Sequence, residues 1–342
     1  MTSWADANVR AGAMAAELIA DLQIPLDRPI DVFDAIERLG IVLAFAPLGP
    51  VSGYYVPRSS PHPSGILLHE GHPRTRQRYT AGHELGHHVF SHTAGQDDDL
   101  EAALQRGNLE RWPDQEKEAE AFGAWFLMPR RLIRHGLGAL GIEAVSTPYD
   151  VYALSLWLGT SYTATARQLS STKLVSYPLA NRWARIPPRT LKASLAGDYV
   201  PDDLRNDVWL LDGRHTNEPI EARPGDRVVL VLDETPSAGY SWAFANLPAQ
   251  VRVLADSYED DWEPQPIGEE SAEGMDLDGG SHPRCFVLEL DRDGGGGEHQ
   301  IALKKEREWS ERGPVDEFSL RIRIHPRLHG VQLPEQDLAL AR

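Results

Sequence analysis

The sequence has a single cysteine, Cys285, so no disulfide bond can form within the chain. This residue lies in the apolar, strand-like stretch PRCFVLEL, where a thiol is typically buried and unreactive. The near absence of cysteine fits a reducing compartment.

Long apolar runs are also missing, and no stretch approaches the about 18 to 20 residues that a membrane-spanning helix requires. The first residues, MTSWADANVRAGAMAAELIADLQ, carry acidic side chains where a signal peptide has a basic start and an uninterrupted apolar core. We therefore expect a cytoplasmic protein with no membrane partner.

Positive charge is scarce relative to negative charge. The 34 Lys and Arg residues face 51 Asp and Glu residues, which gives a formal net charge of -17 at pH 7. Because binding to phosphate groups needs clustered Lys and Arg, this balance argues against tight nonspecific binding to nucleic acid or anionic lipid.

The chain is long enough for more than one domain, since 342 residues exceed the usual size of a single small unit. In residues 1–175, the pattern predicts two short helices between positions 8 and 40 and then three strands, IVLAFAPL, VSGYYVP and SGILLHE. Helical periodicity follows in RQRYTAGHELGHHVFSH, in DQEKEAEAFGAWFLMPRRLIRHGL with a break at Pro129, and in two helices within 148–172.

The second half of the chain has a different sequence pattern. A proline-rich linker is expected at 176–204, and residues 205–330 consist of short β-type runs separated by Gly, Pro and acidic loops. These runs predict an antiparallel β-sandwich, followed by a tail at 331–342. The predicted fold class is α+β, with a helix-rich domain that contains a small sheet followed by an all-β domain.

The stretch RQRYTAGHELGHHVFSH contains His83, Glu84 and His87. Residues four apart on a helix share a face, so both histidines can present a ring nitrogen to one ion, with Glu84 about 100° around the helix. A hydrolytic zinc site uses three protein ligands and one water. The alternative is a solvated helix with incidental histidines, and a third ligand decides between the two.

The predicted helix in EKEAEAFGAWFLMP offers this third ligand. Helical spacing places Glu116 and Glu120 on one face and turns Glu118 toward the other side. We predict Glu116 as the ligand and Glu120 as the acceptor for the other ring nitrogen of a ligating histidine. The alternative is that all these glutamates are solvated, but an acidic group on an apolar face is costly unless it is paired or metal-bound. His88 and His92 are taken as surface or packing residues.

Together, RQRYTAGHELGHH and EKEAEAFGAWFLMP resemble the ImmA/IrrE family of metallopeptidases. The resemblance implies a gluzincin-type fold, Zn2+ held by His83, His87 and Glu116, and Glu84 as the catalytic base. It also implies cleavage of a protein substrate, a helix-turn-helix transcriptional repressor, in stress response or mobile-element control. The second motif departs from the family pattern, with Glu120 in place of Asn or Asp, and with Gly123 and Phe126 in place of Ala and Leu.

Two further features lie next to the histidine motif. The strand at 64–70 is expected to pair with an extended substrate as an added strand. Arg76, Arg78 and Tyr79 are close in sequence, but no pattern identifies one of them as the group that stabilises the oxyanion.

The β-type runs carry three loop segments whose order resembles the chagasin family of cysteine-peptidase inhibitors. The resemblance implies an immunoglobulin-like β fold and a papain-like cysteine peptidase as a partner. The matching binding-loop positions are Thr235, Pro236, Gly239, Tyr240, Gly279, Gly280, Arg307 and Trp309.

The loops also depart from the chagasin pattern. Glu308 replaces a proline, Thr235 replaces the usual asparagine, and an acidic insert precedes the middle loop. These changes affect the inhibitor hypothesis more than the fold, and the alternative is a module that binds a peptide or protein for the metallopeptidase. Trp242 is expected in the core of the sandwich.

Three hypotheses remain open from the sequence. The first is a zinc endopeptidase with an appended recognition domain. The second is a noncatalytic binding protein in which the sandwich captures a peptidase or peptide and the metal site is structural, although a structural site has no need of a base such as Glu84. The third is a DNA-binding regulator built on LGTSYTATARQL, which the excess of acidic residues disfavours.

Overall fold

The computed structural model describes residues 2–92, 112–217, 219–234, 238–258, 282–291, 297–307, 313–325 and 330–332. Within these ranges, no helix is both long enough and apolar enough to cross a membrane.

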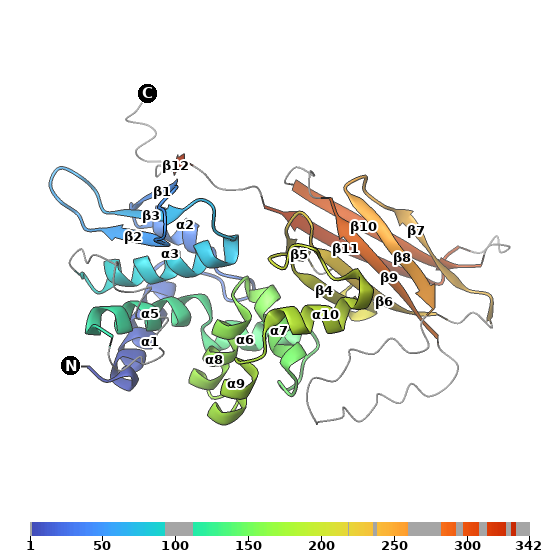
Figure 1. Ribbon diagram of the computed structural model, residues 1–342, viewed down its shortest axis with the longest axis horizontal. Coiled ribbons are helices and arrows are strands. Elements are labelled where there is room, and N and C mark those ends of the chain that lie inside the picture. The colour runs from blue at the N-terminus through green and yellow to red at the C-terminus, as the bar shows by residue number, and fades with distance from the viewer. Residues whose placement is uncertain are drawn as a thin grey trace.

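The first part of the chain stacks three helices on one side of a small sheet (Figure 1). Its elements in chain order are α1 (Trp4–Asp21), α2 (Val32–Arg38), β1 (Val42–Ala46), β2 (Gly53–Val56), β3 (Gly65–His69), α3 (Arg74–Val89) and α5 (Asp114–Leu127). Helix α3 lies against β2 and β3, α5 packs on α3, and α1 packs on α5. The helices and strands predicted for this part are present, but α1 begins at Trp4 and is 18 residues long, so it is not the short helix expected.

Helices α3 and α5 approach each other closely because small residues line their contact. A Cβ atom added at Gly86 would lie 2.9 Å from the Cα atom of Ala119, and one added at Gly123 would lie 3.0 Å from the backbone nitrogen of His83. Neither distance leaves room for a methyl group, so glycine at these positions sets the distance between the helices.

Five helices follow and form a second helical layer: α6 (Arg130–Ala139), α7 (Pro148–Leu158), α8 (Tyr162–Ser171), α9 (Tyr177–Trp183) and α10 (Pro188–Ala196). The linker expected at 176–204 is therefore wrong, since α9 and α10 bury Trp183, Leu191 and Leu195 in the core. The prolines begin these helices instead of breaking them, because the first turn of a helix tolerates a missing N–H group.

The later part of the chain contains two four-stranded sheets. Their strands are β4 (Val208–Asp212), β5 (Pro219–Ala222), β6 (Arg227–Glu234), β7 (Ser241–Asn246), β8 (Val251–Tyr258), β9 (His282–Leu290), β10 (Gly297–Glu306) and β11 (Asp316–Ile324), with short 3-10 helices at Gly197–Tyr199 and Gly213–His215. The strand orders are β4-β6-β9-β8 and β5-β11-β10-β7, and side chains from both sheets share one core. Most pairs are antiparallel as expected, but β4 pairs with β6, and β5 with β11, in parallel.

The chain then returns to the first part. Strand β12 (Gly330–Gln332) pairs antiparallel with β1, with Val331 opposite Ala44, and extends the sheet to the order β12-β1-β3-β2. The beginning of the expected tail, 331–342, is therefore a strand of the N-terminal sheet, which local sequence patterns do not reveal because the pairing partner lies near position 44.

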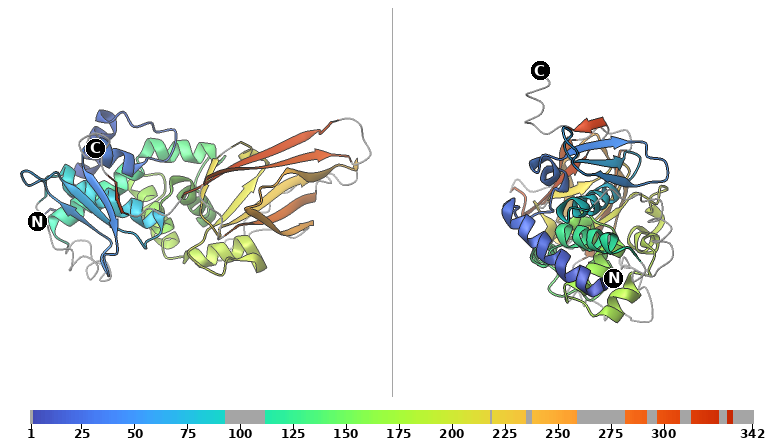
Figure 2. Two further views of the ribbon diagram at one scale, coloured as in Figure 1. Left: turned by 90° about the horizontal axis from the view of Figure 1, so that it is seen from above. Right: turned by 90° about the vertical axis from the view of Figure 1, so that its left-hand side faces the viewer.

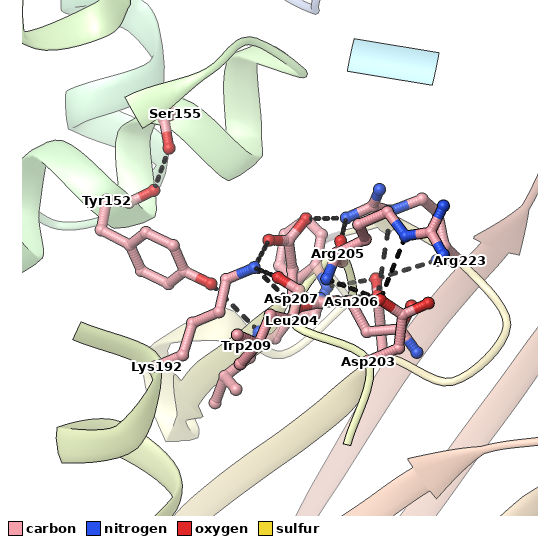
Figure 3. A network of polar contacts seen from close by, with 12 residues as sticks. Tyr152, Ser155, Lys192, Asp203, Leu204, Arg205, Asn206, Asp207, Trp209 and Arg223 are labelled. Carbon is pink, nitrogen blue, oxygen red and sulfur yellow. Dashed lines mark hydrogen bonds and ion pairs between the residues drawn. The ribbon is translucent and has the colours of Figure 1, made fainter. Parts of the chain in front are cut away.

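A buried polar network joins the helical part to the sandwich (Figure 3). The ammonium group of Lys192 on α10 donates to the carbonyl oxygens of Leu204 and Asn206, and lies 2.9 Å from Asp207 Oδ1. Asp207 also pairs with Arg223. Since the apolar core is continuous across this junction and includes Val208 and Val229, the two parts pack directly against each other.

The contact between α3 and α5 predicts an effect on stability. Gly86→Ala should lower the free energy of unfolding by about 1 to 3 kcal/mol, because the added methyl group meets the backbone of Ala119. Gly138→Ala on α6 is the matched control, since nothing lies within 4 Å of its added Cβ, and it should be neutral or stabilising by up to about 1 kcal/mol. Chemical denaturation measures both, and equal stability of the two variants would contradict the packing argument.

The junction predicts a pH effect. Burial and the neighbouring Asp207 carboxylate raise the pKa of Asp226 to about 7, whereas an unfolded aspartate has a pKa of about 3.9. Between these values the folded state binds the proton more tightly, so the contribution of Asp226 to stability falls as the pH rises, by up to about 1.4 kcal/mol per pH unit.

Unfolding curves from pH 4 to 7 test this pH effect. The free energy of unfolding of the wild type minus that of Asp226→Asn should decrease as the pH rises, while the same difference for Gly138→Ala, which changes no titratable group, should stay flat. A difference for Asp226→Asn that does not depend on pH would refute the raised pKa.

Candidate metal centre

The two histidines of the HExxH motif and Glu116 converge at the contact between α3 and α5. The Nε2 atoms of His83 and His87 lie 3.1 Å apart, and Glu116 places Oε2 3.2 Å from His83 Nε2 and Oε1 3.5 Å from His87 Nε2. One ligand atom from each of these three residues lies within 4.8 Å of the other two. They are the residues that the sequence analysis predicts as ligands.

The electrostatics of the group favour a positive charge between the three residues. Burial opposes charge on His83, yet its contacts with Glu116 and Glu120 raise the pKa of His83 well above its usual value. Burial likewise opposes the carboxylate form of Glu116, but the close contacts of its carboxylate with His83 and His87 hold the pKa of Glu116 well below its usual range. Two imidazoles and one carboxylate in this arrangement are a donor set that fits a divalent cation.

Glu120 lies behind His83. Its Oε2 atom is 3.3 Å from His83 Nδ1, and its Oε1 atom accepts a hydrogen bond of 2.8 Å from the Tyr79 hydroxyl. Burial and Glu120 raise the pKa of Tyr79, so the hydroxyl keeps its proton and acts as the donor. The longer acidic side chain at position 120 thus reaches the ring nitrogen that the sequence analysis assigns to it.

Glu84 is buried on α3 and lies near the edge of the sheet. A Cβ added at Gly53, the first residue of β2, would lie 3.3 Å from Glu84 Oε1 and 2.5 Å from Thr80 Cγ2. Only glycine fits there, and its presence lets β2 pass directly against Glu84.

Strand β3 cannot pair with a substrate as the sequence analysis expects. It is hydrogen-bonded to β1 on one side and to β2 on the other, so its backbone is already paired. Among the described strands, β2 forms the edge on the side of Glu84.

Arg76, Arg78 and Tyr79 have other contacts. Arg78 is buried and donates to the carbonyl oxygens of Leu158 and Gly159 at the end of α7, which joins α3 to the second helical layer. Arg76 donates to the hydroxyl of Ser52, and Tyr79 donates to Glu120. These contacts are with residues other than the predicted metal ligands.

Two residues outside the predicted ligand set, His92 and Glu118, lie behind His87. His92, taken as a surface or packing residue, is buried with Nδ1 3.0 Å from His87 Nδ1. Glu118, expected on the far side of its helix, lies 3.1 Å from His92 Nε2 and pairs with Arg10 of α1. Glu118 is buried there because α5 is covered on both sides, by α3 and by α1, so the face that points away from Glu116 is not open to solvent.

The second predicted site lies on the loops of the sandwich. Gly239, with φ of +73°, precedes Tyr240, and the guanidinium of Arg307 lies 4.2 Å from the centre of the Tyr240 ring. The other predicted loop positions lie outside the described residues: Thr235, Pro236, Gly279, Gly280 and Trp309. Trp242 is buried and donates to the carbonyl oxygen of Asp233, as expected for a core residue.

Tyr240 lies at the end of the sandwich that points away from the helices. Strand β6 begins at Arg227, whose N–H donates to Asp207 at the junction, and runs to Glu234, after which the loop with Tyr240 follows. Figure 2 shows the sandwich extending away from the helical part along its strands. The loop end is therefore separated from the candidate metal centre by the length of the sandwich.

Comparison with protein families confirms both resemblances. Residues 36–140 match the model of the IrrE N-terminal-like domain, and residues 221–322 match the model of the chagasin family of peptidase inhibitors. The chain joins an IrrE-like domain to a chagasin-like domain. The first match supports a peptidase, and the second supports a domain that binds as a peptidase inhibitor does.

Solved structures are similar only at a distance. A cysteine protease inhibitor from Entamoeba histolytica, EhICP2, has 17% identity and a TM-score of 0.27, and the match covers 35% of this chain and 96% of that one. A transcriptional regulator from Mycobacterium tuberculosis has 14% identity and a TM-score of 0.30, with 84% of this chain and 76% of that one covered. No curated protein matches the chain.

Proposed function

We propose that the chain is a zinc-dependent endopeptidase with His83, His87 and Glu116 as zinc ligands and Glu84 as the catalytic base. The observation that carries this proposal is the convergence of two imidazole nitrogens and a carboxylate oxygen from two helices within 4.8 Å. The match of residues 36–140 to the IrrE-like family supports the same conclusion.

The chain's own residues supply the proton transfer and the orientation of the substrate. A divalent cation such as Zn2+ at the three ligands supplies Lewis acidity, which lowers the pKa of water and polarises a peptide carbonyl. Glu84 accepts the proton of the attacking water and passes it to the leaving amine. An extended peptide added to the exposed side of β2 would run past Glu84, because β2 begins against that carboxylate.

The finer features of the proposal come from the family resemblances. We place a gluzincin-type domain at 1–204, which includes α9 and α10, and an immunoglobulin-like domain from 205 to the end of β11, with β12 returning to the sheet of the first domain. We propose as substrate a cytoplasmic regulatory protein, such as a helix-turn-helix repressor, that is cleaved in stress response or transcription regulation.

Zinc content per chain tests the ligand assignment. Wild type, purified without added metal and then supplied with zinc, should hold about one ion per chain by plasma mass spectrometry. Glu116→Ala should lose most of it, because Glu116 supplies one of three protein ligands. Glu84→Gln should retain the ion, since a base is not a ligand.

The control for this experiment is Glu17→Ala, which removes an exposed carboxylate from α1. It should bind zinc as wild type does. Absence of zinc from the wild type after supply, or full zinc content in Glu116→Ala, would refute the proposed centre.

A second candidate function is inhibition of a papain-like cysteine peptidase by the sandwich. The stacked pair Tyr240 and Arg307 at the loop end supports it, because aromatic and Arg side chains dominate contact energetics and this end points away from the rest of the chain. The match of residues 221–322 to the chagasin family supports it as well. In this second function the metal centre and the loops act on different proteins.

Inhibition of papain by the full chain tests the second function. Tyr240→Ala should raise the inhibition constant about tenfold or more, since truncating a central contact residue typically costs over 1 kcal/mol. The exposed Arg189→Ala on α10 should leave it unchanged. If wild type fails to inhibit papain at micromolar concentration, the sandwich does not act as such an inhibitor.

A further inference from the structure

The end of helix α3 folds back onto one of the candidate ligands. The helix ends at Val89, and Ser91 adopts the left-handed conformation with φ of +55°. The N–H of Ser91 then donates to the carbonyl of His88 at 3.0 Å, and the N–H of His92 donates to the carbonyl of His87 at 2.9 Å. These two bonds define a Schellman motif. In this motif the side chain two residues after the helix cap, here His92, packs against a side chain of the last helical turn, here His87.

This motif usually makes an apolar contact, but here it joins two imidazoles. His92 Nδ1 lies 3.0 Å from His87 Nδ1, and the ring centres are 5.0 Å apart at an interplanar angle of 69°. Phe90 stacks against the His92 ring, with ring centres 5.5 Å apart and an interplanar angle of 13°. The position of His92 is therefore fixed by backbone geometry and by a ring contact.

Glu118 determines which nitrogen of His92 carries the proton. A carboxylate accepts hydrogen bonds only, and Glu118 Oε2 lies 3.1 Å from His92 Nε2, so this nitrogen is the donor. Neutral His92 then accepts at Nδ1, and His87 must donate from its own Nδ1. This leaves a lone pair on His87 Nε2, the atom that lies 3.1 Å from His83 Nε2 and 3.5 Å from Glu116.

Glu118 is itself held in place. Arg10 of α1 forms an ion pair with it, and the Arg10 guanidinium lies 5.6 Å from the centre of the Phe90 ring. A chain of contacts therefore connects α1, α5 and α3 and ends at the candidate ligand. It runs from Arg10 through Glu118 and His92 to His87.

We propose that His92 and Glu118 are positioning residues that fix the ring orientation and the tautomer of His87. The inference rests on the proposed metal centre and extends it to two residues outside the HExxH motif. Residues that hold a ligating histidine in this way typically contribute a factor of about 10 to 100 to metal affinity.

The zinc dissociation constant, measured by competition with a chelating dye at constant pH, tests this inference. His92→Leu removes the Nδ1 acceptor and places an apolar side chain at a position where a Schellman motif commonly has one. It should weaken zinc binding about 10- to 100-fold. Glu118→Gln should weaken it in the same direction, because an amide can donate to His92 Nε2 and thereby reverse the tautomers along this chain of contacts.

Two variants distinguish positioning from general packing. His92→Asn keeps an acceptor oxygen at the place of Nδ1 and should restore most of the affinity. His88→Leu removes the neighbouring histidine, whose contact is with the Tyr55 hydroxyl, and should leave affinity unchanged. The visible absorption spectrum of cobalt-loaded protein should shift in His92→Leu and Glu118→Gln but not in His88→Leu, since only the first two reorient a ligand.

The outcomes separate this inference from the proposed function. Wild-type affinity and spectrum in both His92→Leu and Glu118→Gln would overturn the positioning role while leaving the metal centre intact. An equal loss in His88→Leu would also overturn it, because the effect would then be general. Failure of wild type to bind zinc at all would overturn the metal centre and this inference with it. If His92→Leu does not fold, Glu118→Gln and His92→Asn decide the question.

Discussion

The close approach of α3 and α5 is the constraint on which the candidate metal centre depends. The two histidines come from one helix and the glutamate from the other, and imidazole and carboxylate side chains of fixed length meet only if the helices nearly touch. Gly86 against Ala119, and Gly123 against the backbone of His83, provide that distance. Gly123 stands where the ImmA/IrrE pattern usually has alanine. The backbone of α3 fills the space that the methyl group of an alanine would need.

The two histidines buried at this contact have polar partners, which form two chains of contacts that lead away from it. His83 is backed by Glu120 and Tyr79, and His87 is backed by His92 and Glu118. Burying so many polar groups is costly unless each has a partner, and a partner also fixes the direction of the ring that it contacts. The same arrangement therefore limits the cost of burial and orients the nitrogen atoms toward one point.

The candidate sites of the IrrE-like domain and the chagasin-like domain lie far apart in the molecule. The metal centre lies in the first helical layer, while the loop with Tyr240 lies at the end of the sandwich that is far from the junction (Figure 2). The junction between them is a continuous core with the buried Lys192 and Asp207 pair. A protein bound at the loops would consequently not occupy the surface beside Glu84, and the peptidase and inhibitor functions proposed for the chain do not exclude each other sterically.

The sequence by itself determined the features that depend on neighbours one helical turn away. The spacing of His83 and His87, the common face of Glu116 and Glu120, and the alternation of the β-type runs follow from the periods of helix and strand, which any segment carries locally. Only the tertiary structure decided that Glu118 is buried and which residues it contacts, because α1 packs on α5 and Arg10 of α1 pairs with Glu118. It also decided that Ser91 turns His92 back onto His87, that residues 176–204 join the core, and that β12 completes the sheet beside β1. Each of these depends on contact between segments far apart in the chain, and local periodicity contains no information about which distant segment will cover a given face.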